Sequence, residues 1–104
     1  MSNKFPHFDE YQQVAKIVTI IKDKVHHKTD VVWIGYDSPE QLSDYLAVCI
    51  EQLRAGDSET LSRIFMMFLP TGTFQELSVS NGWGNEYIEI SGRFVYLLGQ
   101  IRKI

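Results

Sequence analysis

The sequence predicts a mainly α fold, a compact single-domain bundle of about five helices with short loops. Apolar residues recur at helical spacing in several segments, and capping residues and helix breakers separate those segments. Only VVWIGY, residues 31–36, has the β-branched and aromatic content of a strand. The chain has 104 residues, 44% hydrophobic and 22% charged, a composition that suits one globular domain, residues 1–104.

The first helix is predicted over residues 8–27. Pro6 stands just before it, where a missing N–H costs little. His26, His27 and Lys28 are expected in the last turn, where positive charge suits the helix dipole. The predicted buried side consists of Tyr11, Val14, Ile17, Val18, Ile21 and Val25.

Residues 31–36 are compatible with a strand, a buried loop or a turn of helix. No second strand is available to pair with them. An isolated buried strand is costly because its backbone N–H and C=O groups lack partners. We therefore expect an irregular or short helical connection here.

The next helix carries clear signals at both ends. Ser38 is the predicted N-cap, Pro39 takes the first helical position, and Gln41 stands where a capping box needs it. Gly56 is predicted to end the helix in the left-handed conformation that glycine adopts at little cost. The predicted apolar stripe is Leu42, Tyr45, Leu46, Cys49, Ile50 and Leu53.

Residues 65–83 (FMMFLPTGTFQELSVSNGW) are predicted to form the buried centre of the fold. Four aromatic residues and two methionines are crowded there between helix-breaking residues. A third helix, capped by Asp57 or Ser58, is expected to run into this stretch. A capping box at residues 73–76 then predicts a short fourth helix ending at about Ser80.

The last helix follows a predicted turn at residues 81–82. Trp83 is expected to fill the core and Asn85 to cap this helix. Gly92 and Gly99 are seven residues apart and share nearly one side, so we expect another helix to approach closely there. The predicted buried side is Tyr87, Ile88, Ser91, Phe94, Leu97, Leu98 and Ile101.

Charge is unevenly distributed along the chain, although the net charge is only −3. Residues 1–28 carry five lysines against three acids, giving +2, whereas residues 30–60 carry seven acids against one arginine, giving −6. Such a one-sided field repels nucleic acid and favours a cationic partner. The alternative interpretation is an ordinary solvated helix face.

No group of residues predicts catalysis, a cofactor or a metal site. His26 and His27 are adjacent, and on a helix their side chains would point about 100° apart. Cys49 has no neighbouring histidine or lysine and is interpreted as a core residue. Phosphate-binding glycine loops and the GxSxG motif are absent. We therefore expect a binding protein and not an enzyme.

The chain is expected to lie in the cytoplasm. Residues 1–10 lack the apolar core of a signal peptide. The longest run without a charged residue, 64–75, is too short for a membrane span, which needs about 20 apolar residues. A single cysteine excludes an internal disulfide and favours a reducing compartment.

Two aromatic residues stand beside the acidic segment. Trp33 and Tyr36 are close in sequence to Asp37, Glu40 and Asp44. Such a group suits a basic protein partner, because the rings supply buried area and the acids steer the encounter. We predict these five as contact residues; the alternative is that both rings belong to the core.

Three segments resemble a group of small bacterial immunity proteins: WIGYDSPEQL, LRAGDSETL and FLPTGTFQELSVSNGWGNEY. The proteins of this group accompany toxins of contact-dependent growth inhibition and of other polymorphic toxin systems. The resemblance lies outside the first helix, and its motifs are turns, caps and core residues.

The resemblance implies that the chain neutralises a cognate toxin domain in the producing cell by covering its active site, in a 1:1 complex. Many such toxins are nucleases with basic, phosphate-binding clefts, which an acidic segment would match. Two other interpretations stay open: a regulatory adaptor or subunit of another complex, and a small hydrolase.

Overall fold

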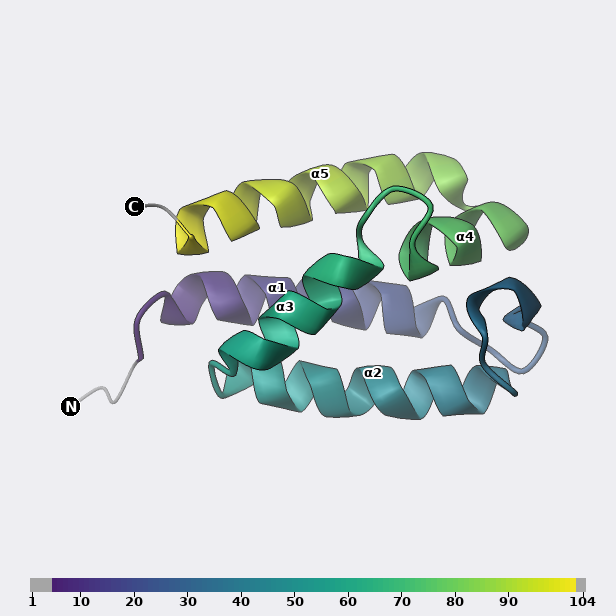
Figure 1. The fold of residues 1–104 in the computed structure, drawn as a ribbon, viewed down its shortest axis with the longest axis horizontal. Coiled ribbons are helices and arrows are strands. Elements are labelled where there is room, and N and C mark those ends of the chain that lie inside the picture. The colour runs from purple at the N-terminus through teal and green to yellow at the C-terminus, as the bar shows by residue number, and fades with distance from the viewer. Residues whose placement is uncertain (1–4, 103–104) are drawn as a thin grey trace.

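The computed structural model describes residues 5–102, and these residues form five α-helices and one short 3₁₀ helix, with no strand among them (Figure 1). The mainly α fold predicted from the sequence is thereby confirmed. The elements are α1 (Phe8–Asp23), η1 (Val32–Ile34), α2 (Pro39–Arg54), α3 (Ser58–Met67), α4 (Thr73–Ser80) and α5 (Gly84–Ile101).

Helix α1 is the centre of the bundle. It packs against α2 on one side and against α5 on the other, and α3 crosses obliquely in front of it (Figure 1). The short helix α4 packs against both α5 and η1. Because α2 and α5 flank α1 from opposite sides, their outward faces point in opposite directions.

The core is formed by one stripe from each helix and a cluster of aromatic rings. Phe68 stacks on Phe94 with 4.1 Å between ring centroids and meets Phe74 edge-on at 4.9 Å. Phe74 and Phe94 are completely buried. The predicted stripe of α1 is confirmed at its main positions, since Tyr11, Val14, Ile17, Val18 and Ile21 are all buried.

The prediction that residues 65–83 form the buried centre is only partly right. Two phenylalanines of this stretch are in the core, but Met66 is exposed on α3. Trp83 is partly buried: its ring meets Tyr87 edge-on at 6.3 Å between centroids and lies beneath the Lys24 ammonium. The central element is α1, because it contacts both long outer helices.

Helix α1 ends at Asp23, about one turn earlier than predicted. His26, His27 and Lys28 lie in the following turn, so their placement in the last helical turn is wrong. The Thr29 hydroxyl accepts a hydrogen bond from the His26 N–H at 2.8 Å, and the Thr29 N–H donates to the His26 carbonyl at 2.9 Å. These local bonds compete with the helix for the same backbone groups.

Two of the predicted helix caps are confirmed. The Ser38 hydroxyl accepts from the Gln41 N–H at 3.1 Å, and the Asp57 carboxylate accepts from the Glu59 N–H at 3.1 Å. The Gln41 side chain accepts from the Asp37 N–H and not from Ser38, so only the serine half of the capping box forms.

Two other predicted caps are wrong. Helix α4 begins directly after Gly72, so Thr73 is its first residue and no side chain caps it. Helix α5 begins after Trp83, which leaves Asn85 exposed inside the first turn. The Trp83 N–H donates to the Ser78 carbonyl at 2.9 Å and closes the turn between α4 and α5. Helix α5 begins directly after this turn, so Trp83 and not Asn85 occupies the N-cap position.

Helix α5 buries Ile90 and leaves Ile88 71% exposed, so the prediction for Ile88 is wrong. The two positions lie about 160° apart on a helix, and only one can face the core. No atom lies within 4 Å of a Cβ built at Gly92 or Gly99, so within residues 5–102 no helix approaches there as expected. Tyr87, Phe94, Leu97 and Leu98 are buried as predicted, whereas Ser91 and Ile101 are only partly buried.

Replacing Gly56 by alanine is expected to lower the free energy of unfolding by about 2 kcal/mol. Its φ is +82°, as predicted for the end of α2, and a Cβ there would lie 2.7 Å from the Phe5 ring. The Gly82→Ala variant is the control, because φ is +84° but no atom lies within 4 Å of its Cβ. Denaturant unfolding should show the larger loss for Gly56→Ala; equal losses would contradict the ring clash.

Candidate protein-binding surface

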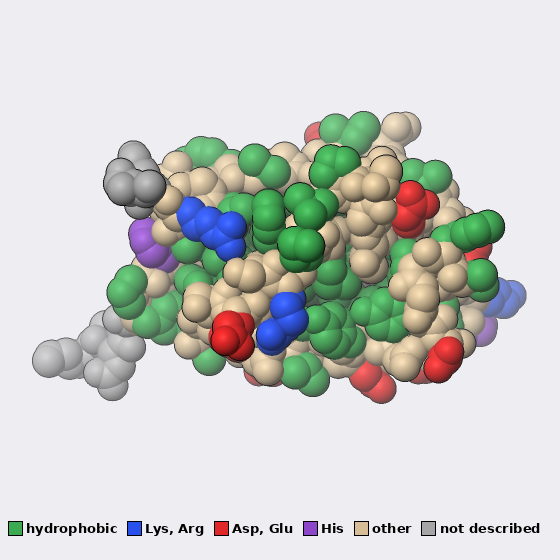
Figure 2. Space-filling view, viewed as in Figure 1, with side chains coloured by type: hydrophobic (Ala, Val, Ile, Leu, Met, Phe, Trp, Pro, Cys, Tyr) green, Lys and Arg blue, Asp and Glu red, His purple; other side chains and the backbone are tan. Residues whose placement is uncertain are grey.

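The five predicted contact residues lie on η1, on the turn that follows it and on the first two turns of α2. We call this group the docking surface: Trp33, Tyr36, Asp37, Glu40 and Asp44. Figure 2 shows acidic side chains along the α2 edge of the molecule and hydrophobic side chains at the end where η1 lies.

Trp33 is 75% exposed, so it is not a core residue. It stands on a 3₁₀ turn of three residues, in which Val32 is exposed as well and Ile34 packs against the core. Gly35 ends that turn with a φ of +80°. The expectation of a short helical connection over residues 31–36 is confirmed. The turn fixes the backbone of Trp33, and most of its indole ring stays accessible to a partner.

The loop that carries Trp33 is tied to the turn between α4 and α5, which is distant in sequence. The Asp30 N–H donates to the Asn81 side-chain oxygen at 2.8 Å, and the Asn81 amide donates back to the Asp30 carbonyl at 3.0 Å. The Asp30 carboxylate also accepts from the Val32 N–H at 3.1 Å. Sequence reasoning assigned only a turn to Asn81, and nothing in its local pattern indicates this long-range pair.

Tyr36 differs from Trp33 in its surroundings. It is partly buried and packs against the core. Burial raises the pKa of its phenol above the ordinary value, and the neighbouring Cys49 thiol raises it further. Tyr36 therefore links the docking surface to the core, and it offers a partner less accessible surface area than Trp33 does.

Three acids of the docking surface are exposed and carry no salt bridge within residues 5–102: Asp37, Glu40 and Asp44. Glu40 and Asp44 are four residues apart on α2 and so share one face. Glu40 lies in the first turn, where a negative charge is favourable with respect to the helix dipole. These carboxylates are free to meet cations of another molecule.

The remaining acids of residues 30–60 are mostly engaged within the chain. The Asp57 carboxylate accepts from the Thr60 hydroxyl at 2.8 Å, and this bond holds the pKa of Asp57 below its ordinary value. Asp30 caps the turn at η1. Asp30 and Asp57 keep their negative charge but are only partly exposed, and Glu51 is paired with Arg54. The exposed acids of this segment without a salt bridge within residues 5–102 are therefore those of the docking surface and Glu59 at the start of α3.

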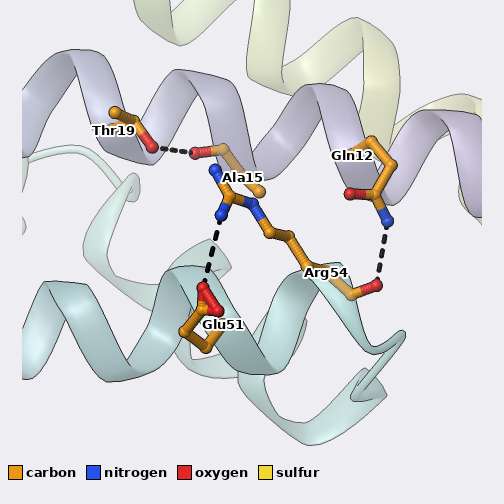
Figure 3. A network of polar contacts seen from close by, with 5 residues as sticks. All are labelled: Gln12, Ala15, Thr19, Glu51 and Arg54. Carbon is orange, nitrogen blue, oxygen red and sulfur yellow. Dashed lines mark hydrogen bonds and ion pairs between the residues drawn. The ribbon is translucent and has the colours of Figure 1, made fainter.

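The other end of α2 is tied to α1 and partly neutralised (Figure 3). The Arg54 guanidinium lies 3.3 Å from the Glu51 carboxylate, and the Gln12 amide donates to the Arg54 carbonyl at 2.9 Å. On α1, the Thr19 hydroxyl bonds back to the Ala15 carbonyl at 2.8 Å. The uncompensated negative charge of α2 therefore belongs to its N-terminal half.

The described residues contain no group of three or more histidine, cysteine or carboxylate side chains that could hold a metal ion. Cys49 is buried, and burial raises the pKa of its thiol, so it is a poor nucleophile.

Among residues 5–102, no helix combines the length and apolar character that a membrane span needs. The expectation about a signal peptide falls partly on residues 1–4, outside the described range.

Two open grooves lie away from the docking surface. One, of about 680 Å³, runs between α1 and α5 and is lined by Ile20, Glu89, Arg93 and Tyr96 among others. The second, of about 480 Å³, lies between α4 and α5. Neither includes a residue of the docking surface.

The sequence matches no protein-family model, and neither curated proteins nor solved structures give a match.

Proposed function

We propose that this chain is an immunity protein that binds and neutralises a cognate toxin domain by laying the docking surface into the toxin's basic active-site cleft. One observation carries the proposal: the stretch from η1 to the first turns of α2 exposes both a tryptophan, 75% accessible, and three acids that form no salt bridge within residues 5–102. The resemblance of residues 33–87 to immunity proteins supports the same function. The expected complex is a 1:1 heterodimer in the cytoplasm.

The two kinds of side chain make different contributions. Burial of an exposed indole against a partner yields one of the largest energies that a single residue gives to an interface. Unpaired carboxylates speed the encounter with a cationic surface and reject an anionic one. The acids form no salt bridge within residues 5–102, so no such pair among these residues is lost on binding to offset their attraction to the partner.

A basic nuclease is the partner that this chemistry fits best. A nuclease cleft binds phosphates with lysine and arginine, and carboxylates spaced along a helix can occupy those cationic positions. Inhibition then needs no catalysis by the immunity protein. The alternative function is a regulatory adaptor or subunit of another complex, which would use the same kind of surface on a different partner.

Co-expression with the protein encoded by the neighbouring gene tests this function. We expect that protein to stop growth when expressed alone, and this chain to restore growth and to co-purify with it. If the neighbouring protein is not toxic yet binds the chain, the adaptor alternative holds. If the two proteins do not bind and growth is not restored, the proposal fails.

Replacing Trp33 by alanine is expected to weaken toxin binding by about 30-fold or more, in the range of interface hot spots. The thermal midpoint of the free protein should change little, because the side chain is exposed. Calorimetric titration against the toxin domain measures the loss. The matched control is Met66→Ala, which removes an exposed side chain from α3 and should leave the affinity unchanged.

A Trp33→Ala variant that binds as tightly as the natural protein would remove Trp33 from the interface. Equal weakening by Met66→Ala would show that the effect is general and does not belong to the docking surface.

A further inference from the structure

Helix α5 carries two apolar stripes, and only one of them faces the core. The second is formed by Ile88, Val95 and Tyr96, which are 71%, 61% and 67% exposed, together with Gly92 and Gly99. By helical geometry these five positions span about 100°, the width of a stripe that normally packs against another element. No charged residue of α5 lies within this span.

We propose that this outward stripe is an interface with a second copy of the chain, in which the two α5 helices pack antiparallel about a two-fold axis. In such an interface each copy presents the same surface to the other. With the axis passing between residues 91 and 92, Ile88 lies beside Val95 of the second copy. This contact occurs twice by symmetry, so Ile88 and Val95 are covered in both copies.

The charges at the edge of the stripe select a second copy as the occupant. Glu89 and Arg93 lie along one edge, and neither forms a salt bridge within residues 5–102. A two-fold axis brings that edge beside the same edge of the second copy. The register that pairs Ile88 with Val95 also brings Glu89 next to Arg93 of the second copy, on both sides of the axis.

The backbone at the axis allows a close approach. Gly92 is exposed, and nothing lies within 4 Å of a Cβ built there. Helix axes come closest where the contact residues are small.

A cationic toxin is a poorer occupant of this face. The opposite charges of Glu89 and Arg93 sum to zero, so the face has no net electrostatic attraction for a cationic protein.

The docking surface stays free in this dimer. Helices α2 and α5 flank α1 from opposite sides, so contact through α5 leaves η1 and α2 uncovered (Figure 1). Two toxin domains can then bind one dimer of the chain, so the ratio of one toxin domain to one chain stays as in the heterodimer proposed above. The inference is independent of the proposed function, since it concerns the free chain.

Sedimentation equilibrium of the full chain tests the interface. We expect a mass that rises with concentration from 12.0 kDa toward twice this value.

Val95→Glu should weaken dimerisation at least about tenfold, because it places a charge in the apolar stripe. Val48→Glu, at a position 55% exposed on α2, is the matched control and should dimerise like the natural chain. A natural chain that stays at 12.0 kDa up to about 1 mM, or a Val95→Glu variant that dimerises equally well, would overturn the inference.

A charge swap tests the register itself. Arg93→Glu alone should weaken dimerisation about tenfold, because it sets like charges side by side. The double variant Glu89→Arg with Arg93→Glu restores opposite charges and should recover dimerisation to within about threefold. Circular dichroism checks that each variant is folded. A double variant no better than the single one would overturn the antiparallel register.

Discussion

Replacing Asp37, Glu40 and Asp44 together by lysine is expected to weaken toxin binding by about two to three orders of magnitude. Each change removes one attraction to a basic cleft and adds one repulsion. None of the three acids forms a salt bridge within residues 5–102, so the substitutions break none in that part of the chain. Titrations at several salt concentrations should also show that the variant's affinity depends less steeply on salt.

The control for this variant separates the site from overall charge. Asp44→Lys and Glu59→Lys each change the net charge by the same amount, and Glu59 lies exposed at the start of α3, away from the docking surface. We expect a clear loss of affinity for Asp44→Lys and little change for Glu59→Lys. Equal losses would indicate general attraction between the two proteins and would remove Asp44 from the interface.

Replacing Phe94 by alanine is expected to lower the free energy of unfolding by about 3–5 kcal/mol. Phe94 is completely buried and stacks on Phe68, which in turn contacts Phe74 and Tyr87. Removal of the ring therefore opens a cavity where α3, α4 and α5 meet. Because small domains have only about 5–15 kcal/mol of stability in total, denaturant unfolding should show a large shift of the midpoint.

The matched control for Phe94→Ala is Phe94→Leu. Leucine keeps most of the apolar volume, so its cost should be clearly smaller than that of alanine. A loss below about 1 kcal/mol for Phe94→Ala would mean that the surrounding helices close over the space, and that the aromatic cluster does not determine the stability of the fold.

Much of the fold could be predicted because its signals are local. The apolar period of α1 and the Ser38 and Asp57 caps depend on residues within one or two turns of each other. The left-handed φ of Gly56 follows the same logic, because that conformation is intrinsic to glycine. These features require no knowledge of the tertiary structure.

The two errors on α5 and α4 have different causes. On α5, the helical period alone places Ile90 on the side of Phe94 and Leu97 and places Ile88 on the opposite side, so the burial of Ile90 could have been predicted from the sequence. Thr73 has the residue type of an N-cap, but the backbone turn that ends at Gly72 starts the helix first. The Gly72 N–H donates to the Leu69 carbonyl in this turn, and the residue types around Thr73 do not indicate that bond.

The sequence predicts which residues belong to the candidate site, but it does not predict which of their side chains are exposed. Charge density points to residues 30–60, yet the engagement of Asp30 and Asp57 within the chain follows from hydrogen bonds to Val32 and Thr60. Both acids are only partly exposed, so the exposed acids of this segment without a salt bridge within residues 5–102 are those of the docking surface and Glu59. The contrast between exposed Trp33 and partly buried Tyr36 likewise depends on how η1 packs against α4.

Hydrogen exchange of backbone amides, compared between the free chain and its complex with the purified toxin domain, tests the docking surface most directly. We predict slower exchange on binding at residues 32–44, across η1 and the first turns of α2. Exchange at residues 88–99 of α5 should be the same in both samples. Protection confined to α5, with no change at residues 32–44, would contradict the account.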